Sequence, residues 1–165
     1  MGLVALAVSA CGSGLRPHRG LPVTEQLLTP ADISRTPAGS PQRALITWWR
    51  DVQFSNQIGY LDFLAPPIAA RELRSNVAGL YLAILSGQLQ PAKPQIVGMT
   101  AHANLVTIYS SVISHQPIGT QLYVTTSRPQ AFTLARVDGR WRLLDDYFVR
   151  VLVGPVLAAR GQPVP

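Results

Sequence analysis

Residues 132–148, FTLARVDGRWRLLDDYF, decide the fold of this 165-residue chain. Apolar and polar side chains alternate on both sides of Asp138-Gly139, which is typical of strands with one buried face. An Asp-Gly pair between strands favours a two-residue turn, because both positions of that turn need a positive φ. The stretch therefore predicts an antiparallel hairpin, with strands over residues 131–137 and 140–148.

The turn also predicts the register of the hairpin, because a two-residue loop pairs Val137 with Arg140. Counting outward gives three further opposed pairs: Arg136 with Trp141, Leu134 with Leu143, and Phe132 with Asp145. One face is the more apolar, and we expect it to face the helices or a concave cleft. It carries Phe132, Leu134, Arg136, Trp141, Leu143, Asp145 and Tyr147.

More strands are predicted before the hairpin. After Pro94 the spacing of apolar residues changes from about 3.6 to about 2. Residues 95–99, 104–114 and 121–127 are then predicted as strands, and the second of them is rich in Val, Ile, Thr and Tyr. His115 is expected in the loop that follows it.

Two helices are predicted before these strands. Ser40-Pro41 marks the start of the first, since serine caps helix N-termini and proline suits the first helical position. Its apolar residues fall on one face, at Leu45, Trp48, Trp49 and Val52. The second is expected over residues 68–85, with Glu72 outside an apolar stripe formed by Leu73, Val77, Leu80, Tyr81 and Ile84.

Helices followed by antiparallel strands predict an α+β fold, in which N-terminal helices pack on a curved antiparallel sheet. WWRDVQFSNQIGYLDFL, followed by the second helix, and FTLARVDGRWRLLDDYF carry a family resemblance. Over residues 40–148 the chain resembles the nuclear-transport-factor-2-like (NTF2-like) cone fold of exported actinobacterial proteins. That family includes ketosteroid-isomerase-like enzymes, polyketide cyclases, and binding and assembly modules, so the resemblance implies a fold and not one function.

The N-terminus indicates export. Residues 3–10, LVALAVSA, form an uncharged stretch of signal-peptide length that is too short to span a bilayer. Val8-Ser9-Ala10-Cys11 resembles the bacterial lipobox, which implies cleavage before Cys11 and its acylation with fatty acids such as palmitate. Residues 1–10 hold no Lys or Arg, so we expect the natural start to lie upstream.

These signals divide the chain into four expected parts. Residues 1–10 are the lipoprotein signal segment, and residues 11–39, rich in Gly, Pro, Ser and Thr, are expected to be a flexible tether. Residues 40–150 are the NTF2-like domain, and residues 151–165 are a C-terminal tail. The expected location is the outer face of the cell membrane.

The net charge and the small number of Cys and His residues limit which binding partners, metals and cofactors are expected. The formal net charge is +6, but the 14 basic residues form no run, so we expect no nucleic acid as partner. An anionic lipid or cell-wall surface fits this charge better than nucleic acid does, but we favour a generally basic surface without a specific partner. A single cysteine excludes an intramolecular disulfide and CxxC motifs. The spacing of His102 and His115 fits no metal motif, and we expect no metal and no cofactor.

The candidate ligand site is a cleft between the first helix and the apolar face of the sheet. It comprises Trp48, Trp49, Tyr109, Phe132, Leu134, Trp141, Leu143, Asp145 and Tyr147. Asp145 is either a general base in apolar surroundings or a rim residue paired with an arginine, and we favour the rim. Tyr60, Asp62, Tyr109 and Tyr123 are a further possible set for proton transfer.

The sequence shows no catalytic motif, so we expect a non-catalytic envelope lipoprotein that acts as a binding or assembly module. Its ligand would be a small apolar molecule or an envelope protein, and the apolar face could also bury itself in a homodimer. The alternative is a small cavity enzyme of the isomerase or cyclase type that uses an acid such as Asp145.

Replacing Cys11 by Ala in the full-length precursor should release the protein from the membrane fraction, because the acyl chains would be lost. Membrane fractionation and labelling with radioactive palmitate check this. A variant that stays in the membrane fraction and still takes up label would contradict the anchor.

Overall fold

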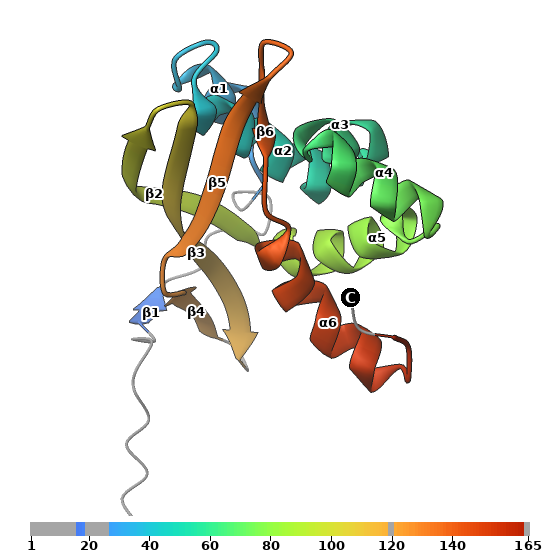
Figure 1. The fold of residues 1–165 in the computed structure, drawn as a ribbon. Coiled ribbons are helices and arrows are strands. Elements are labelled where there is room, and N and C mark those ends of the chain that lie inside the picture. The colour runs from blue at the N-terminus through green and yellow to red at the C-terminus, as the bar shows by residue number, and fades with distance from the viewer. Residues whose placement is uncertain (1–15, 19–26, 119–120, 164–165) are drawn as a thin grey trace, which may run out of the picture.

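The computed structural model describes residues 16–18, 27–118 and 121–163, and the side chains of residues 27–113 and 126–163. It is an α+β fold with helices before and after an open antiparallel sheet (Figure 1). The helices are α1 (Pro30–Ser34), α2 (Pro41–Gln53), α3 (Gln57–Phe63), α4 (Pro66–Arg74), α5 (Ala78–Leu89) and α6 (Tyr147–Ala159). The strands are β1 (Arg16–His18), β2 (Ala92–His102), β3 (Leu105–Ile118), β4 (Gln121–Thr126), β5 (Gln130–Val137) and β6 (Arg140–Leu143).

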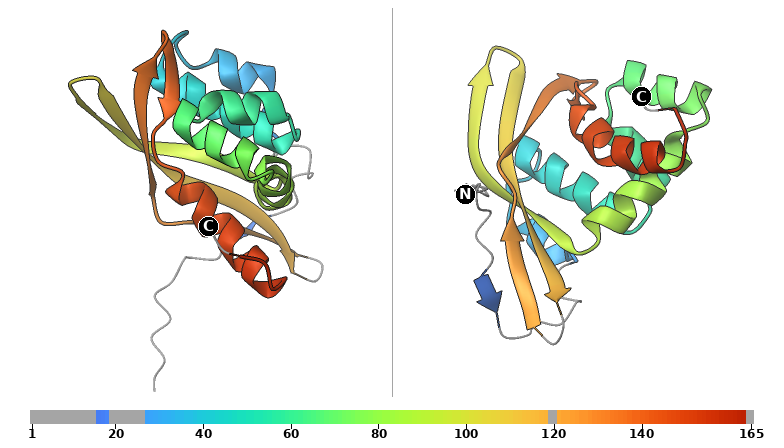
Figure 2. Two further views of the ribbon diagram at one scale, coloured as in Figure 1. Left: turned by 45° about the vertical axis from the view of Figure 1, so that its right-hand side comes forward. Right: turned by 90° about the horizontal axis from the view of Figure 1, so that it is seen from below.

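The long strand β3 organises the sheet. Its first part pairs with β2 and β5, its last part pairs with β4, and all three pairings are antiparallel. A register shift between Ile96 and Gly98 marks a bulge in β2, and bulges bend a strand and increase its twist. Figure 2 shows the helices gathered on one side of this twisted sheet.

The Asp-Gly hairpin is confirmed. Asp138 and Gly139 have φ values of 49° and 75°, as a turn with two positive φ angles requires. Val137 pairs with Arg140, Arg136 with Trp141, and Leu134 with Leu143.

The predicted strand over 140–148 is wrong beyond Leu143, and Phe132 does not pair with Asp145. The chain turns at Asp145, whose Oδ1 accepts a hydrogen bond from the Tyr147 backbone N–H at 2.8 Å. Helix α6 follows, so the expected tail from residue 151 is also wrong. Val149, Val153 and Leu157 are spaced four apart and buried, and this helical period outweighs the short alternation before it.

Helix α2 forms as predicted. The Ser40 hydroxyl accepts a hydrogen bond from the Arg43 N–H at 3.1 Å, and the four expected apolar residues are buried.

The single helix expected over 68–85 is instead two helices, α4 and α5. Asn76 adopts a φ of 52°, a conformation common just after a helix C-terminus, and it ends α4. Because the helix is interrupted at Asn76, α4 buries a different face from the one predicted for a single helix. Glu72 is only 1% exposed, whereas Leu73, which was expected in the apolar stripe, is 55% exposed.

Aromatic rings fill the space between helices and sheet. The Trp48 ring stacks on Phe63 at 5.3 Å between centroids and meets Trp49 edge-on at 6.2 Å. The Phe148 ring packs against those of Trp49 and Phe132, with 5.7 and 4.8 Å between ring centroids. Because Phe148 belongs to α6, the C-terminal helix completes the core.

The segment expected to be a tether contains ordered structure. Strand β1 pairs with β4, and Thr29 caps α1 in a reciprocal capping box with Asp32. Leu28, just before this cap, is 5% exposed and joins the core. Among the described residues, no helix is long and apolar enough to cross a bilayer.

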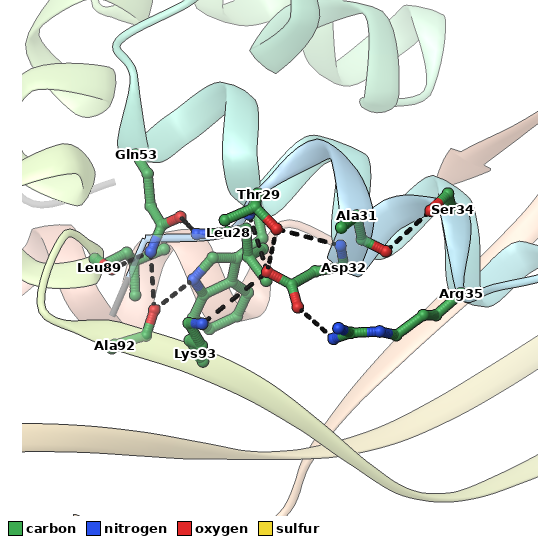
Figure 3. Close-up of polar contacts among 11 residues, drawn as sticks. Leu28, Thr29, Ala31, Asp32, Ser34, Arg35, Gln53, Leu89, Ala92 and Lys93 are labelled. Atoms are coloured by element: carbon green, nitrogen blue, oxygen red, sulfur yellow. Dashed lines mark hydrogen bonds and ion pairs between the residues drawn. The ribbon is translucent and has the colours of Figure 1, made fainter. Parts of the chain in front are cut away.

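A buried amide connects this early segment to the rest of the domain (Figure 3). Gln53 accepts a hydrogen bond from the Leu28 N–H at 3.0 Å. Its amide nitrogen donates to the carbonyls of Leu89 and Ala92, at 3.1 and 2.9 Å. One side chain thus links α2, the end of α5, the start of β2 and the segment before α1.

Gln53→Ala should lower the free energy of unfolding by roughly 2–4 kcal/mol, because buried backbone groups of Leu28 and Leu89 lose their side-chain partner. Urea unfolding followed by circular dichroism measures the change. Gln57→Ala, an exposed site on α3, is the matched control and should change stability by about 0.5 kcal/mol or less. Equal effects of the two substitutions would contradict the linking role of Gln53.

Candidate functional site

Most of the predicted cleft residues form the core. Trp49, Phe132, Leu134 and Leu143 are at most 1% exposed, so they are packed in the core and do not line an open cleft between α2 and the sheet. Trp48 is equally buried, although it reaches the wall of a surface hollow. The expected cleft is therefore filled, because the aromatic rings of α2 and α6 occupy it.

The polar members of the predicted cleft lie at the surface. Tyr109 and Tyr147 are 38% and 57% exposed. The Asp145 side chain is 60% exposed and lies 3.8 Å from a guanidinium nitrogen of Arg150. Asp145 is therefore the rim residue paired with an arginine that we favoured from the sequence. A carboxylate exposed to water is not placed to act as a buried general base.

Trp141 lines a hollow of about 320 Å³ beside the hairpin turn. Its indole N–H donates to the Gly39 carbonyl at 2.9 Å. Asp62, also in this wall, pairs with Arg140 and Arg142, each at 3.0 Å. These ion pairs neutralise the acid that the sequence suggested for proton transfer.

The structure does not bring the suggested proton-transfer set together. Tyr60 is buried in the core, Asp62 lies at the hairpin, and Tyr109 is exposed on the sheet. The side chain of Tyr123 lies outside the described residues.

The structure does bring together a buried acid and a tyrosine that the sequence did not single out as a pair. Glu72 on α4 lies with both carboxyl oxygens 2.8 and 3.1 Å from the Tyr60 hydroxyl on α3. Burial raises the pKa of Glu72 from 4.5 to about 7, against the hydrogen bond from Tyr60, which lowers it. Asp146 raises the same pKa further, and Arg71 lowers it.

The neighbouring tyrosines remain protonated. Burial raises the pKa of Tyr60 well above its ordinary value, and the Glu72 carboxylate adds to this effect. Burial also raises the pKa of Tyr81 on α5, again with a contribution from Glu72. Glu72 is therefore the group in this cluster that can change its protonation near neutral pH.

Two arginines hold a second buried acid beside this pair. Asp146, 5% exposed, binds Arg71 of α4 through Oδ2 and Arg150 of α6 through Oδ1, the latter at 3.0 Å from Nε. The two guanidinium-bearing side chains remain 53% and 42% exposed. The ion pairs thus join α4 to the start of α6 and keep both cations accessible to solvent.

A hollow of about 350 Å³ opens at this cluster, and we call it the acid hollow. It is lined by Arg71, Glu72, Ser75, Val77, Tyr81, Arg150 and Pro163. A second hollow, of about 500 Å³, lies between α5, α6 and the sheet, and we call it the apolar hollow. Its lining comprises Gly87, Gln88, Leu89, Pro91, Ala92, Val112, Ser127, Gln130, Phe148, Val151 and Leu152.

Sequence reasoning missed Glu72 because it treated residues 68–85 as one helix. The signal that was available is Asn76, since Asn commonly occupies the position after a helix end. A helix ending there separates residues 66–74 from the stripe of α5 and removes the reason to place Glu72 on the solvent side.

Comparison of the chain with protein-family models, with curated proteins and with solved structures gave no match. Within the described part of the chain, no group of three or more His, Cys, Asp or Glu side chains is placed to hold a metal ion.

The raised pKa of Glu72 makes stability depend on pH. Between about pH 4.5 and about pH 7 the folded chain binds this proton more tightly than the unfolded chain, so stability falls as the pH rises through that window. The free energy of unfolding falls by at most about 3 kcal/mol across this pH range. Glu72→Gln, which cannot ionise, should abolish this decline and be more stable than the native chain at about pH 8.

Thermal unfolding at a series of pH values tests this. Asp138→Asn in the exposed hairpin turn is the control, and it should leave the pH dependence between about 4.5 and 7 in place. A native chain whose stability does not decline relative to Glu72→Gln would show that Glu72 is ionised at ordinary pH.

Proposed function

We propose that this chain is an exported, lipid-anchored cell-envelope protein whose domain, of the NTF2-like cone type, is a non-catalytic binding module. The anchor rests on the lipobox at Cys11. The fold assignment rests on the order of the helices and strands, the bent antiparallel sheet and the closing Asp-Gly hairpin. The proposed ligand is a small apolar molecule held in the apolar hollow.

The composition of the apolar hollow is the observation that carries this proposal. Its volume of about 500 Å³ is within the usual range for small-molecule sites, roughly 300–1,000 Å³. None of its described lining residues carries an ionisable side chain. A hollow with apolar walls and without an acid or base suits binding better than catalysis.

One of the few polar groups in this wall is suited to orient a ligand. The Gln88 amide nitrogen donates to the Leu152 carbonyl at 3.0 Å, which leaves the Gln88 carbonyl as an acceptor at the wall. The Ser127 hydroxyl, by contrast, is already engaged: it accepts a hydrogen bond from the Val112 N–H and donates one to the Arg128 carbonyl, each at 2.9 Å. Val151 is 45% exposed, so part of the apolar wall is open to solvent and accessible to a ligand.

A cavity enzyme is the second candidate function, and one observation favours it. Glu72, rather than the exposed Asp145, is the acid that is buried, paired with a tyrosine and in the wall of a hollow. A carboxyl group with a pKa of about 7 is matched to proton transfer at neutral pH.

Filling the apolar hollow should weaken ligand binding without harming the fold. A Cβ added at Gly87 meets no atom within 4 Å, so Gly87→Phe can extend into the space beside α5. The native chain should bind the neutral fluorophore N-phenyl-1-naphthylamine and gain thermal stability with it. Gly87→Phe should weaken this binding by about tenfold or more, which is about 1.4 kcal/mol.

Gly79→Phe is the matched control. Gly79 lies on the same helix, is equally open and is not part of either hollow, so this variant should bind the probe like the native chain. Equal binding by both variants would contradict the proposed site.

Light scattering on the native chain checks whether a homodimer covers the apolar hollow. A dimer that Gly87→Phe dissociates would assign this face to subunit contact instead.

A further inference from the structure

We infer that the acid hollow is a second binding site, for a small organic acid whose carboxylate lies between Arg71 and Arg150 and whose binding brings one proton onto Glu72. This site is separate from the apolar hollow, and its ligand differs in charge. The inference goes beyond the proposed function and does not depend on it.

The first support is the pair of accessible cations. Asp146 accepts a hydrogen bond from Arg71 and one from Arg150, which holds the two side chains beside each other. Each guanidinium has five N–H donors. Within the described part of the chain, Asp145 and Asp146 are the ion-pair partners of these two arginines, so donors remain for a ligand. Paired guanidinium donors suit the planar, bidentate recognition of a carboxylate.

The second support is the balance of charge at the hollow. Two arginines against the buried Asp146 leave one positive charge before the exposed Asp145 is counted, and an ionised Glu72 would add a buried negative charge beside them. Asp145 is further out, with its carboxylate 60% exposed to solvent, which screens it. A monoanion is therefore attracted most strongly when Glu72 is neutral, and the bound anion in turn favours the neutral form of Glu72.

The two phenols that face Glu72 do not take part in this proton uptake. Tyr60 of α3 and Tyr81 of α5 stay protonated, because burial and Glu72 raise the pKa of both phenols. The remaining charged neighbours are Arg71 of α4, on the same helix as Glu72, and Asp146 at the start of α6.

The third support is the remaining lining of the acid hollow. Val77, Tyr81 and Pro163 also line the hollow and add apolar surface to it, and Ser75 adds one further polar residue. A volume of about 350 Å³ accommodates a ring or a short chain that carries one carboxylate. The ligand class is thus an organic acid with an apolar body, rather than a bare inorganic anion.

Calorimetric titration of the native chain with benzoate tests the inference, and benzamide, of similar shape but neutral, is the control ligand. Benzoate should bind at about pH 5.5 and weaken by up to about tenfold per pH unit above pH 7. Titrations in buffers of different ionisation enthalpy should show uptake of up to one proton near neutral pH and none at about pH 5.5. Benzamide should bind at least about tenfold more weakly at low pH.

Single substitutions test the contribution of each group in the acid hollow separately. Glu72→Gln should bind benzoate with the same affinity from about pH 5.5 to about pH 8.5 and without proton uptake. Arg150→Gln should weaken benzoate at every pH, whereas Arg160→Gln, exposed at the end of α6, should not. Gly87→Phe should bind benzoate like the native chain, so the two hollows are tested independently.

Three results would overturn the inference. The first is equal binding of benzoate and benzamide to the native chain, a measurement that needs no variant to fold. The second is an unchanged pH dependence in Glu72→Gln. The third is stronger binding of inorganic phosphate than of benzoate, which would make the hollow a phosphate site.

Discussion

Burial of the aromatic rings of α2 is the constraint on which the rest of the structure depends. Trp48 and Trp49 are at most 1% exposed, and α2 contacts α1, α3, α5 and strands β2, β3 and β6. Fully burying such large rings stabilises the fold by a few kcal/mol each, at roughly 25 cal/mol per Å² of apolar surface. This packing fills the space between α2 and the sheet, and the hollows described above lie at its flanks.

Helix α6 contributes to the walls of two hollows of opposite character. Arg150 lines the acid hollow, while Val151 and Leu152, its neighbours in sequence, line the apolar hollow. Successive residues of a helix point about 100° apart, so one helix can serve both walls. The Asp146 ion pairs and the Phe148 ring fix the start of α6, and they thereby position both walls at once.

Local signals in the sequence were sufficient for the elements that carry strong turn or cap chemistry. The Asp138-Gly139 turn, its register as far as Leu143, and the capped start of α2 at Ser40 are all as predicted. The candidate site was not predictable in the same way. Glu72 and Tyr60 are 12 residues apart, and Asp146 lies 75 residues beyond Arg71, so no periodicity relates them.

By itself, the sequence determined the α+β class, the antiparallel hairpin and the one-sided helix α2, because turns, caps and apolar periods act through neighbouring residues. Only the tertiary structure decided that the expected cleft is core, that α6 replaces the end of the last strand, and that Glu72 is buried beside two arginines. The physical reason is that burial and pKa depend on which distant segments pack together. A residue such as Glu72 is a surface acid or a buried acid according to where α4 ends and where α6 lies.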